Sequence, residues 1–282
     1  MPDEVQHDQA PDLARALEVA QQAASEAGRV LQSLRGDAAR MRSTTKSSLR
    51  DLVTAADLAA ERAIVARLRD AFPGHAIEAE EATRDERDER PRWFVDPLDG
   101  TVNYVHGLPS YCVSIALWHR GAPQVAVVHA PQLRERHRAV RGGGCWTEQL
   151  DQHGEPCSAP ARQSVSTCAA LHDALLATGF AYRRHELANP NVANFARLIL
   201  RVRDIRRCGS AALDLAWTAC GRLDGYWELH LSPHDVAAGG LLVLEAGGIV
   251  GDMLGGGDWL RAGHVLAAPR TLHALLAREL EV

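Results

Sequence analysis

The sequence predicts an α/β protein whose first half is α+β and whose second half is α/β. Two patterns carry this prediction. Before residue 150, two amphipathic helical segments precede a group of short apolar strand candidates, and after residue 150 helical and strand patterns alternate. Grouped elements are typical of α+β folds, whereas alternation is typical of α/β folds. The 282 residues are enough for one large domain or two closely packed halves.

Two helices are predicted near the start of the chain. Between 12 and 34, apolar residues recur every third or fourth position, which is the period of an amphipathic helix ending at Gly36. The polar, basic segment 37–50 is predicted to be a loop. A second helix begins at Thr54 and ends where Pro73 and Gly74 interrupt it.

The rest of the first half is predicted to contain mainly strands. The candidates are apolar or alternating segments, and the dense run of charges at 83–92 is expected to be a solvated loop. The predicted strands are 76–78, 93–95, 111–118, 124–129 and 137–141. The polar segment 149–166 contains two prolines, so we place the boundary between the halves there and describe them as 1–150 and 151–282.

The second half is predicted to alternate between helices and strands. Ser210 is a hydroxyl cap and Gly221 a stop for one helix, and the glycines at 247–248 close another. The predicted helices are 191–201, 210–220, 235–246 and 271–280, and the predicted strands are 204–206, 226–227, 249–250 and 264–267.

The composition excludes several classes of protein. A net charge of −5 and a pI near 6.2 argue against a large nucleic-acid footprint. No apolar run approaches the length of a membrane span, and the first ten residues lack the apolar core of a secretory signal. The six cysteines form no C-x-x-C pair, so we expect buried thiols in a reducing cytosol rather than disulfides. These features favour a cytoplasmic protein.

The segment 93–104 carries the strongest chemical signal. Three apolar residues form a buried strand that ends in Asp96, Pro97 and Asp99, followed by Gly100 and a threonine. Carboxylates suit hard cations such as Mg²⁺, and the backbone N–H groups of a turn suit phosphate. The alternative is a simple turn, because Asp-Pro and Asp-Gly are common turn dipeptides.

Other acids extend this signal, although each has a purely structural explanation. Glu80 follows the strand at 76–78 but could belong to a solvated acidic face. Asp57 could complete a capping box with Thr54. Asp235 could simply favour the start of its helix, and Glu228 precedes it across a short loop. No phosphate-binding P-loop and no G-x-S-x-G motif occurs.

Taken together, these residues resemble the inositol monophosphatase family of Mg²⁺-dependent, lithium-sensitive phosphatases. The resemblance runs from about residue 13 to 280. Residues 96–104 are similar to the family motif D-P-[IL]-D-G-T-x-N-[FY], and 234–239 resemble W-D-x-A-[AG]-[AG] with His234 in place of the tryptophan. Three further blocks match, at 51–57, 80–81 and 206–212. The resemblance implies a layered αβαβα sandwich, usually a homodimer.

The resemblance also implies the ligands of the metal ions. Glu80, Asp96 and the carbonyl of Leu98 would hold one Mg²⁺ ion. Asp96, Asp99 and Asp235 would hold a second, and a weaker third ion would lie near Glu80.

The remaining roles implied by the family concern water and substrate. Thr101, supported by Asp57, would orient the attacking water, and we count both with Glu80 as catalytic. The N–H groups of Gly100 and Thr101 would hold phosphate, whereas Ala211 and Glu228 would contact the alcohol part of the substrate. Lys46 and its loop would form a flap near the metal ions.

The predicted function is Mg²⁺-dependent hydrolysis of a phosphate monoester, with inositol 1-phosphate as the first substrate. The partner is therefore a small phosphorylated polyol or sugar, with neither membrane nor nucleic acid expected. Fructose 1,6-bisphosphate, a phosphonucleotide and histidinol phosphate are alternative substrates. A third possibility is a non-catalytic partner in transcription or ribosomal RNA processing. The change to His234 is expected to alter substrate fit or local packing and not metal binding.

Overall fold

The structure is a computed structural model that describes residues 10–35, 44–45, 52–53 and 55–282. The predicted frayed terminus, the stop at Gly36, the Lys46 flap and the cap at Thr54 lie outside these residues. The short β1 (Thr44–Thr45) and β2 (Leu52–Val53) pair with each other in antiparallel fashion.

A seven-stranded sheet forms the first half of the molecule. Its order is β3-β4-β5-β6-β7-β8-β9, and all neighbours are antiparallel except β3 and β4. The strands are β3 (Ala76–Ala79), β4 (Arg92–Asp99), β5 (Cys112–His119), β6 (Ala122–Ala130), β7 (Glu135–Val140), β8 (Gly144–Gln149) and β9 (Ala161–Gln163). Strand residues alternate between the faces, so Trp93 and Val95 belong to one core and Phe94 to another.

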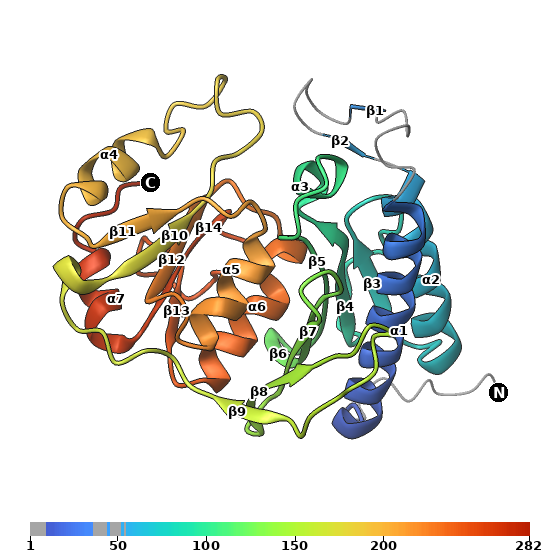
Figure 1. Cartoon of the computed structure of the whole chain (residues 1–282). Coiled ribbons are helices and arrows are strands. Elements are labelled where there is room, and N and C mark those ends of the chain that lie inside the picture. The colour runs from blue at the N-terminus through green and yellow to red at the C-terminus, as the bar shows by residue number, and fades with distance from the viewer. Residues whose placement is uncertain (1–9, 36–43, 46–51, 54) are drawn as a thin grey trace.

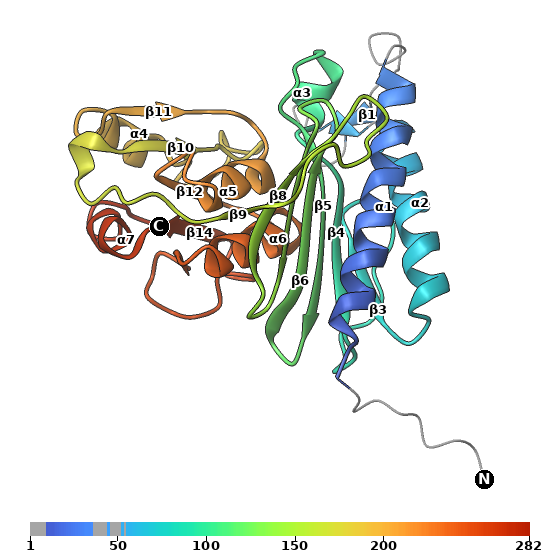
Figure 2. The same ribbon diagram turned by 60° about the horizontal axis from the view of Figure 1, so that its bottom comes forward.

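Two long helices cover one face of this sheet, as Figure 2 shows. They are α1 (Leu13–Leu34) and α2 (Ala55–Ala71). The side chain of Asp12 accepts hydrogen bonds from the first-turn amides of α1, so it caps this helix. The buried face of α1 consists mostly of alanine, which lets the helix lie close against β5 and β6.

Two further helices separate the large sheet from a second, five-stranded sheet (Figure 2). They are α5 (Ala211–Ala219) and α6 (Pro233–Glu245). The second sheet has the order β11-β10-β12-β14-β13 and is mixed. Its strands are β10 (Leu175–Thr178), β11 (Asp204–Arg206), β12 (Gly225–Leu229), β13 (Ile249–Gly251) and β14 (His264–Ala268).

The last layer is formed by α4 (Val192–Ile199) and α7 (Arg270–Leu276), which pack with the outer face of the second sheet (Figure 1). Two short helical segments, α3 (Thr101–Val105) and η2 (Leu171–Asp173), complete the described structure. The order of layers is helix, sheet, helix, sheet, helix, which confirms the predicted αβαβα sandwich. The boundary at residue 150 stays a prediction. β9 lies beyond this residue and still belongs to the first sheet.

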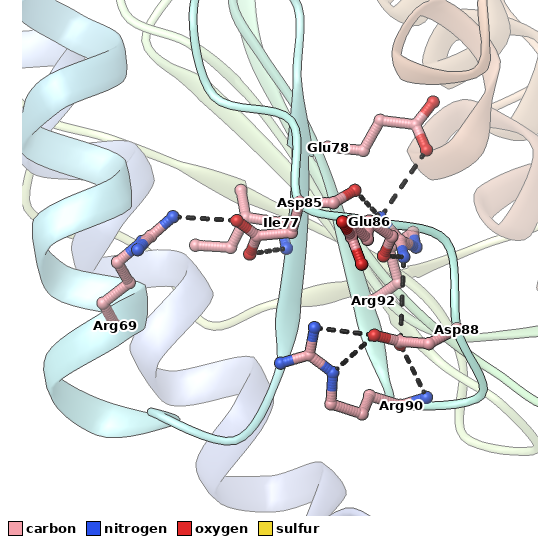
Figure 3. A network of polar contacts seen from close by, with 8 residues as sticks. All are labelled: Arg69, Ile77, Glu78, Asp85, Glu86, Asp88, Arg90 and Arg92. Atoms are coloured by element: carbon pink, nitrogen blue, oxygen red, sulfur yellow. Dashed lines mark hydrogen bonds and ion pairs between the residues drawn. The ribbon is translucent and has the colours of Figure 1, made fainter.

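The structure differs from the predicted secondary structure in several strands and at one residue of the charged run. β8, β9 and β10 were not predicted, because glycines and polar residues hide β8, β9 lies in the polar segment 149–166, and β10 has only four residues. The charged run at 83–92 is a mostly exposed loop, as predicted, except for Arg92, which begins β4. The guanidinium of Arg92 is buried and donates to the backbone carbonyls of Asp85 and Glu86, and Asp85 accepts from the amide of Ile77 (Figure 3).

Two expectations drawn from composition can also be compared with the structure. No helix among the described residues is long and apolar enough to span a membrane. All six cysteines are free. Only Cys112 and Cys145 are buried, whereas Cys157 is exposed and the other three are partly exposed, so the expectation of buried thiols was wrong for most of them.

Candidate active site

The acidic residues predicted as metal ligands come from three elements that meet at one end of the large sheet. β3 and β4 run parallel, and the amide of Glu80, just after β3, donates to the carbonyl of Val95 over 3.0 Å. This register brings Glu80 beside Asp96, the next residue of β4. The pairing of β4 with β5 then shifts between Asp96 and Asp99, which is the irregularity expected at Pro97.

The fourth acid, Asp235, belongs to the first turn of α6. Its carboxylate accepts from the amide of Ser232 over 2.7 Å, and the Ser232 side chain caps the helix in return. This capping box shows that Asp235 stabilises the start of α6, which is the purely structural role considered for it from the sequence. The same residue also faces β4, because α6 packs across that strand.

The pKa values show that these four carboxylates act on one another. Burial, followed by repulsion from Glu80, Asp99 and Asp235, raises the pKa of Asp96 well above its usual value. Burial and the charge of Asp235 also raise the pKa of Asp99 to about 7, although hydrogen bonds from Ser210 and the amide of Ala212 oppose the shift. Bringing several carboxylates together around the buried Asp96 is costly, so the site suits a cation.

Glu80, Asp99 and Asp235 line one cavity and Asp96 adjoins them, but the acids do not form a closed coordination shell. Among the residues that the structure describes, no three His, Cys, Asp or Glu side chains are arranged closely enough to hold a metal ion by themselves. The donor set is nevertheless rich in carboxylate oxygens, the ligands preferred by hard divalent cations. The residues present therefore fit such an ion, with further ligands left to water and substrate.

Thr101 and Asp57 form a buried pair beside the acids. The hydroxyl of Thr101 lies 3.1 Å from Oδ1 of Asp57 and 3.2 Å from the carbonyl oxygen of Leu98. The Asp57 side chain comes from the first turn of α2 and is fully buried. A buried acid that contacts the threonine of another element has a use beyond capping its own helix.

Gly100 is needed at the turn between β4 and α3. Its φ is +97°, in the left-handed region that favours glycine, and a Cβ there would lie 2.9 Å from the carbonyl oxygen of Ser110. Thr101 begins α3 directly after this turn, so its amide and that of Gly100 precede the internal hydrogen bonds of the helix.

An open cavity of about 340 Å³ adjoins the acids. Glu80, Asp99 and Asp235 line it, and so do Ala211 and Glu228. The structure thus brings together metal-ligand and substrate candidates from both predicted halves. Asp57, Asp96, Leu98, Gly100 and Thr101 lie behind this wall and do not line the cavity.

Glu228 is held in place from two sides. The hydroxyl of Tyr226 donates a short hydrogen bond to its carboxylate, and Gly179 leaves the space that the carboxylate occupies. Burial raises the pKa of Glu228 to about 7, and the negative charges of Asp235 and Asp99 add to this, whereas Tyr226 opposes it. Such a carboxyl group can exchange a hydrogen bond with a hydroxyl group of a ligand near neutral pH.

Several residues of this site were missed from the sequence. Ser210 and the amide of Ala212 both donate to Asp99 over 2.7 Å. Arg207 lines the cavity, and its positive charge opposes the raised pKa of Glu228. Asp214 lines it too and is buried, with Oδ1 unpartnered. An acid inside the apolar helix pattern of 211–216 was the signal that could have identified Asp214.

His234 occupies the position where the resemblance expects tryptophan. Its side chain is buried at the cavity wall, with Nε2 3.6 Å from Oδ1 of Asp235. The imidazole therefore adds a polar group next to a predicted metal ligand, in place of a larger ring. His230, the other histidine near the site, is exposed and contacts the carbonyl of Asn189.

One protein family matches the sequence along almost the whole chain. Residues 12–282 match the inositol monophosphatase family. The chain belongs to this family. Among curated relatives of this inositol monophosphatase family member, the Nus factor SuhB of Salmonella typhimurium (strain LT2) is 40% identical over 263 residues, covering 93% of this chain and 94% of the relative. The Nus factor SuhB of Escherichia coli (strain K12) is 42% identical over 229 residues, covering 80% and 82%.

Solved structures of other family members have the same fold. The inositol monophosphatase from Anabaena (Nostoc) sp. PCC 7120 superimposes with a TM-score of 0.82 and is 39% identical, covering 95% of this chain and 96% of that one. The extragenic suppressor protein suhB from Bartonella henselae has a TM-score of 0.84 and is 36% identical, covering 94% and 98%. The family includes proteins named for phosphatase activity and proteins named for another role.

Proposed function

We propose that this protein is a Mg²⁺-dependent phosphate monoester hydrolase. The observation that carries the proposal is the group of acids at the end of β4, where the charges of Glu80, Asp99 and Asp235 add to burial in raising the pKa of Asp96. Membership of the inositol monophosphatase family supports the same chemistry.

Glu80, Asp96, Asp99, Asp235 and the carbonyl of Leu98 would hold the cations. Bound divalent ions would neutralise the phosphoryl oxygens and make a water molecule more acidic. Asp99 is oriented for this role by Ser210 and Ala212, and Asp235 by its capping box. Fixed ligands reduce the reorganisation that cation binding requires.

The other residues position water and substrate. Thr101 would hold the attacking water through its hydroxyl, which Asp57 orients from behind. The Gly100 and Thr101 amides would bind the phosphate group, because first-turn amides have no acceptor within their own helix. Glu228 and Ala211 would contact the alcohol part across the cavity.

The variant Asp96→Asn tests this proposal. It keeps the size of the side chain and removes a charge shared by both predicted metal sites. We expect a loss of several kcal/mol of transition-state stabilisation, or about a thousandfold or more in Mg²⁺-dependent phosphate release. Asp70→Asn, on the exposed face of α2, is the matched control. Near-normal turnover in folded Asp96→Asn would overturn the assignment.

Inositol 1-phosphate is the substrate that we propose first. A polar cavity with a carboxyl group that has a pKa of about 7 suits an alcohol with several hydroxyl groups. Phosphate release should be compared for inositol 1-phosphate, fructose 1,6-bisphosphate, a phosphonucleotide and histidinol phosphate, with and without lithium. A homodimer is also proposed, and light scattering of the purified protein would test it.

A role in transcription is the second candidate. It is favoured by the relatives of 40–42% identity that are named Nus factor SuhB. Binding of the purified chain to RNA polymerase and transcription elongation factors can be measured with wild-type protein and with Asp96→Asn. Binding that both proteins share would support a role independent of catalysis, and the absence of binding would argue against it.

A further inference from the structure

A second cluster of reactive groups lies at the other end of α5 from the acids. Ala212, near the start of α5, donates to Asp99, whereas Cys220 is the residue that caps the end of the helix. The Cys220 side chain faces β7 and β8 of the large sheet. There, His137 and Thr147 stand opposite each other in the antiparallel register.

Three atoms of this cluster are in mutual contact. Sγ of Cys220 lies 3.4 Å from Nδ1 of His137 and 3.3 Å from Oγ1 of Thr147, and the last two atoms are 2.9 Å apart. A thiol that touches both an imidazole and a hydroxyl can pass its proton to the imidazole. The resulting thiolate keeps the hydroxyl as a hydrogen-bond donor.

The imidazole is in turn supported by an acid. Nε2 of His137 lies 3.4 Å from Oε2 of Glu135, an ion-pair distance when the ring is protonated. The Glu135 carboxylate is held by Nη1 of Arg222 at 2.7 and 2.8 Å from its two oxygens. Thiol, imidazole and carboxylate thus follow one another in the order that activates a nucleophilic cysteine.

The charges around Cys220 favour its thiolate. Burial alone would raise the pKa of Cys220, but hydrogen bonds and charge from His137, with smaller effects of Thr147 and Arg222, lower it overall. The pKa of His137 is raised in spite of its burial, because Cys220 and Glu135 stabilise the protonated ring. The neighbouring thiol of Cys145 is buried and has a raised pKa, so it does not compete.

We infer that Cys220 is a nucleophilic thiol and a site of modification by peroxides and soft electrophiles, separate from the predicted active site. Cys220 is partly exposed as a residue, and the reagents in question are small. With hydrogen peroxide, the thiolate sulfur attacks one oxygen and a sulfur–oxygen bond forms. The oxygen–oxygen bond breaks, and the departing hydroxide takes a proton to become water. The product is a sulfenic acid.

The other cysteines provide internal comparisons. Cys157 is exposed and lies outside any such cluster. Cys168 and Cys208 are partly exposed like Cys220, but burial raises the pKa of each. If accessibility alone determined reactivity, Cys157 would therefore react fastest. Because the surrounding charges favour the thiolate of Cys220, Cys220 should instead react fastest at low pH.

The test is the pH dependence of alkylation of the full-length protein by iodoacetamide, followed by peptide mass spectrometry. The midpoint for Cys220 is expected at a lower pH than the midpoint for Cys157. At a pH below both midpoints, each pH unit by which the Cys220 midpoint lies below that of Cys157 should raise the alkylation rate of Cys220 only about three- to fourfold. The gain is limited because the nucleophilicity of a thiolate falls with its pKa. A midpoint for Cys220 equal to or above that of Cys157 would overturn the inference, and no variant is needed to see it.

Two substitutions then identify the cause. His137→Gln removes the ring and should move the Cys220 midpoint up to that of Cys157 or above it, because burial alone raises the pKa of Cys220. Thr147→Val keeps the packing volume and removes the hydroxyl that contacts both Cys220 and His137, and it should move the Cys220 midpoint by less. Glu186→Gln, which changes an exposed ion pair with His185, is the control. If neither His137→Gln nor Thr147→Val moves the midpoint, the cluster is not the cause of the reactivity.

Peroxide reactivity gives an independent readout. Treatment with dilute hydrogen peroxide and dimedone, which traps sulfenic acids, should label Cys220 before Cys157. Cys220→Ser should lose this label and retain the alkylation of the other cysteines. Preferential labelling of Cys157 would contradict the inference.

Discussion

The contact between Thr101 and Asp57 gives a prediction that separates positioning from packing. Thr101→Val keeps the shape of the side chain and removes the hydroxyl that lies 3.1 Å from the Asp57 carboxylate. Both side chains are buried, so the Asp57 carboxylate would lose a hydrogen-bond donor within the protein. A hydrogen bond to a charged group contributes about 1.5–3 kcal/mol.

If the hydroxyl positions the attacking water, this energy is lost from the transition state. Since about 1.36 kcal/mol corresponds to a tenfold change in rate, kcat/KM should fall by roughly 10- to 150-fold. The assay is release of inorganic phosphate from inositol 1-phosphate at saturating Mg²⁺. Thr101→Ser, which keeps the hydroxyl, is the matched control and should retain most of the activity.

A double-mutant cycle completes this test. Because the two residues are proposed to act as one unit, Asp57→Asn combined with Thr101→Val should be little worse than either single variant. Thermal unfolding of each protein excludes a general loss of structure. Turnover of Thr101→Val within twofold of wild type, or fully multiplicative effects in the double variant, would refute the proposed pairing.

Two further predictions concern buried side chains. Burial, helped by nearby positive charges, lowers the pKa of His129 to about 3. The unfolded state, in which the pKa is about 6.5, therefore binds a proton at a higher pH than the folded state does. The free energy of unfolding should accordingly fall as the pH drops below about 6.5. Urea unfolding at pH 5, 6 and 7 should give a flatter pH dependence for His129→Gln, whereas His172→Gln, an exposed control, should keep the wild-type slope. In Gly179→Ala, the new Cβ would lie 1.9 Å from Oε2 of Glu228, so the carboxylate must move and KM should rise by about tenfold or more. Gly257→Ala, whose Cβ meets nothing within 4 Å, should leave KM unchanged, and an equal KM in the two variants would contradict the role given to Glu228.

Local chemistry explains why much of the fold was predictable from the sequence. The periodic apolar residues of α1 and the capping residues of α6 act within a few positions of one another. The same holds for the end of β4, where Pro97 and Gly100 shape the turn that carries Asp96, Asp99 and Thr101. Such signals need no knowledge of distant segments.

Other features depended on contacts between distant segments. β8 contains glycine and polar residues, and only pairing with β7 and β9 makes it a strand. Arg92 lies in a charged run that looks solvated, yet it is buried against the backbone of the same run (Figure 3). Tertiary contacts override local preference at such positions.

The sequence by itself determined the acidic strand end and the residue types that a cation would need. Only the tertiary structure decided which groups stand together: Ser210 reaches Asp99 across 111 positions, and Cys220 meets His137 across 83. The physical reason is that turn and capping preferences act through neighbouring backbone groups. Contacts between elements depend instead on sheet register and helix packing, which the whole chain sets together.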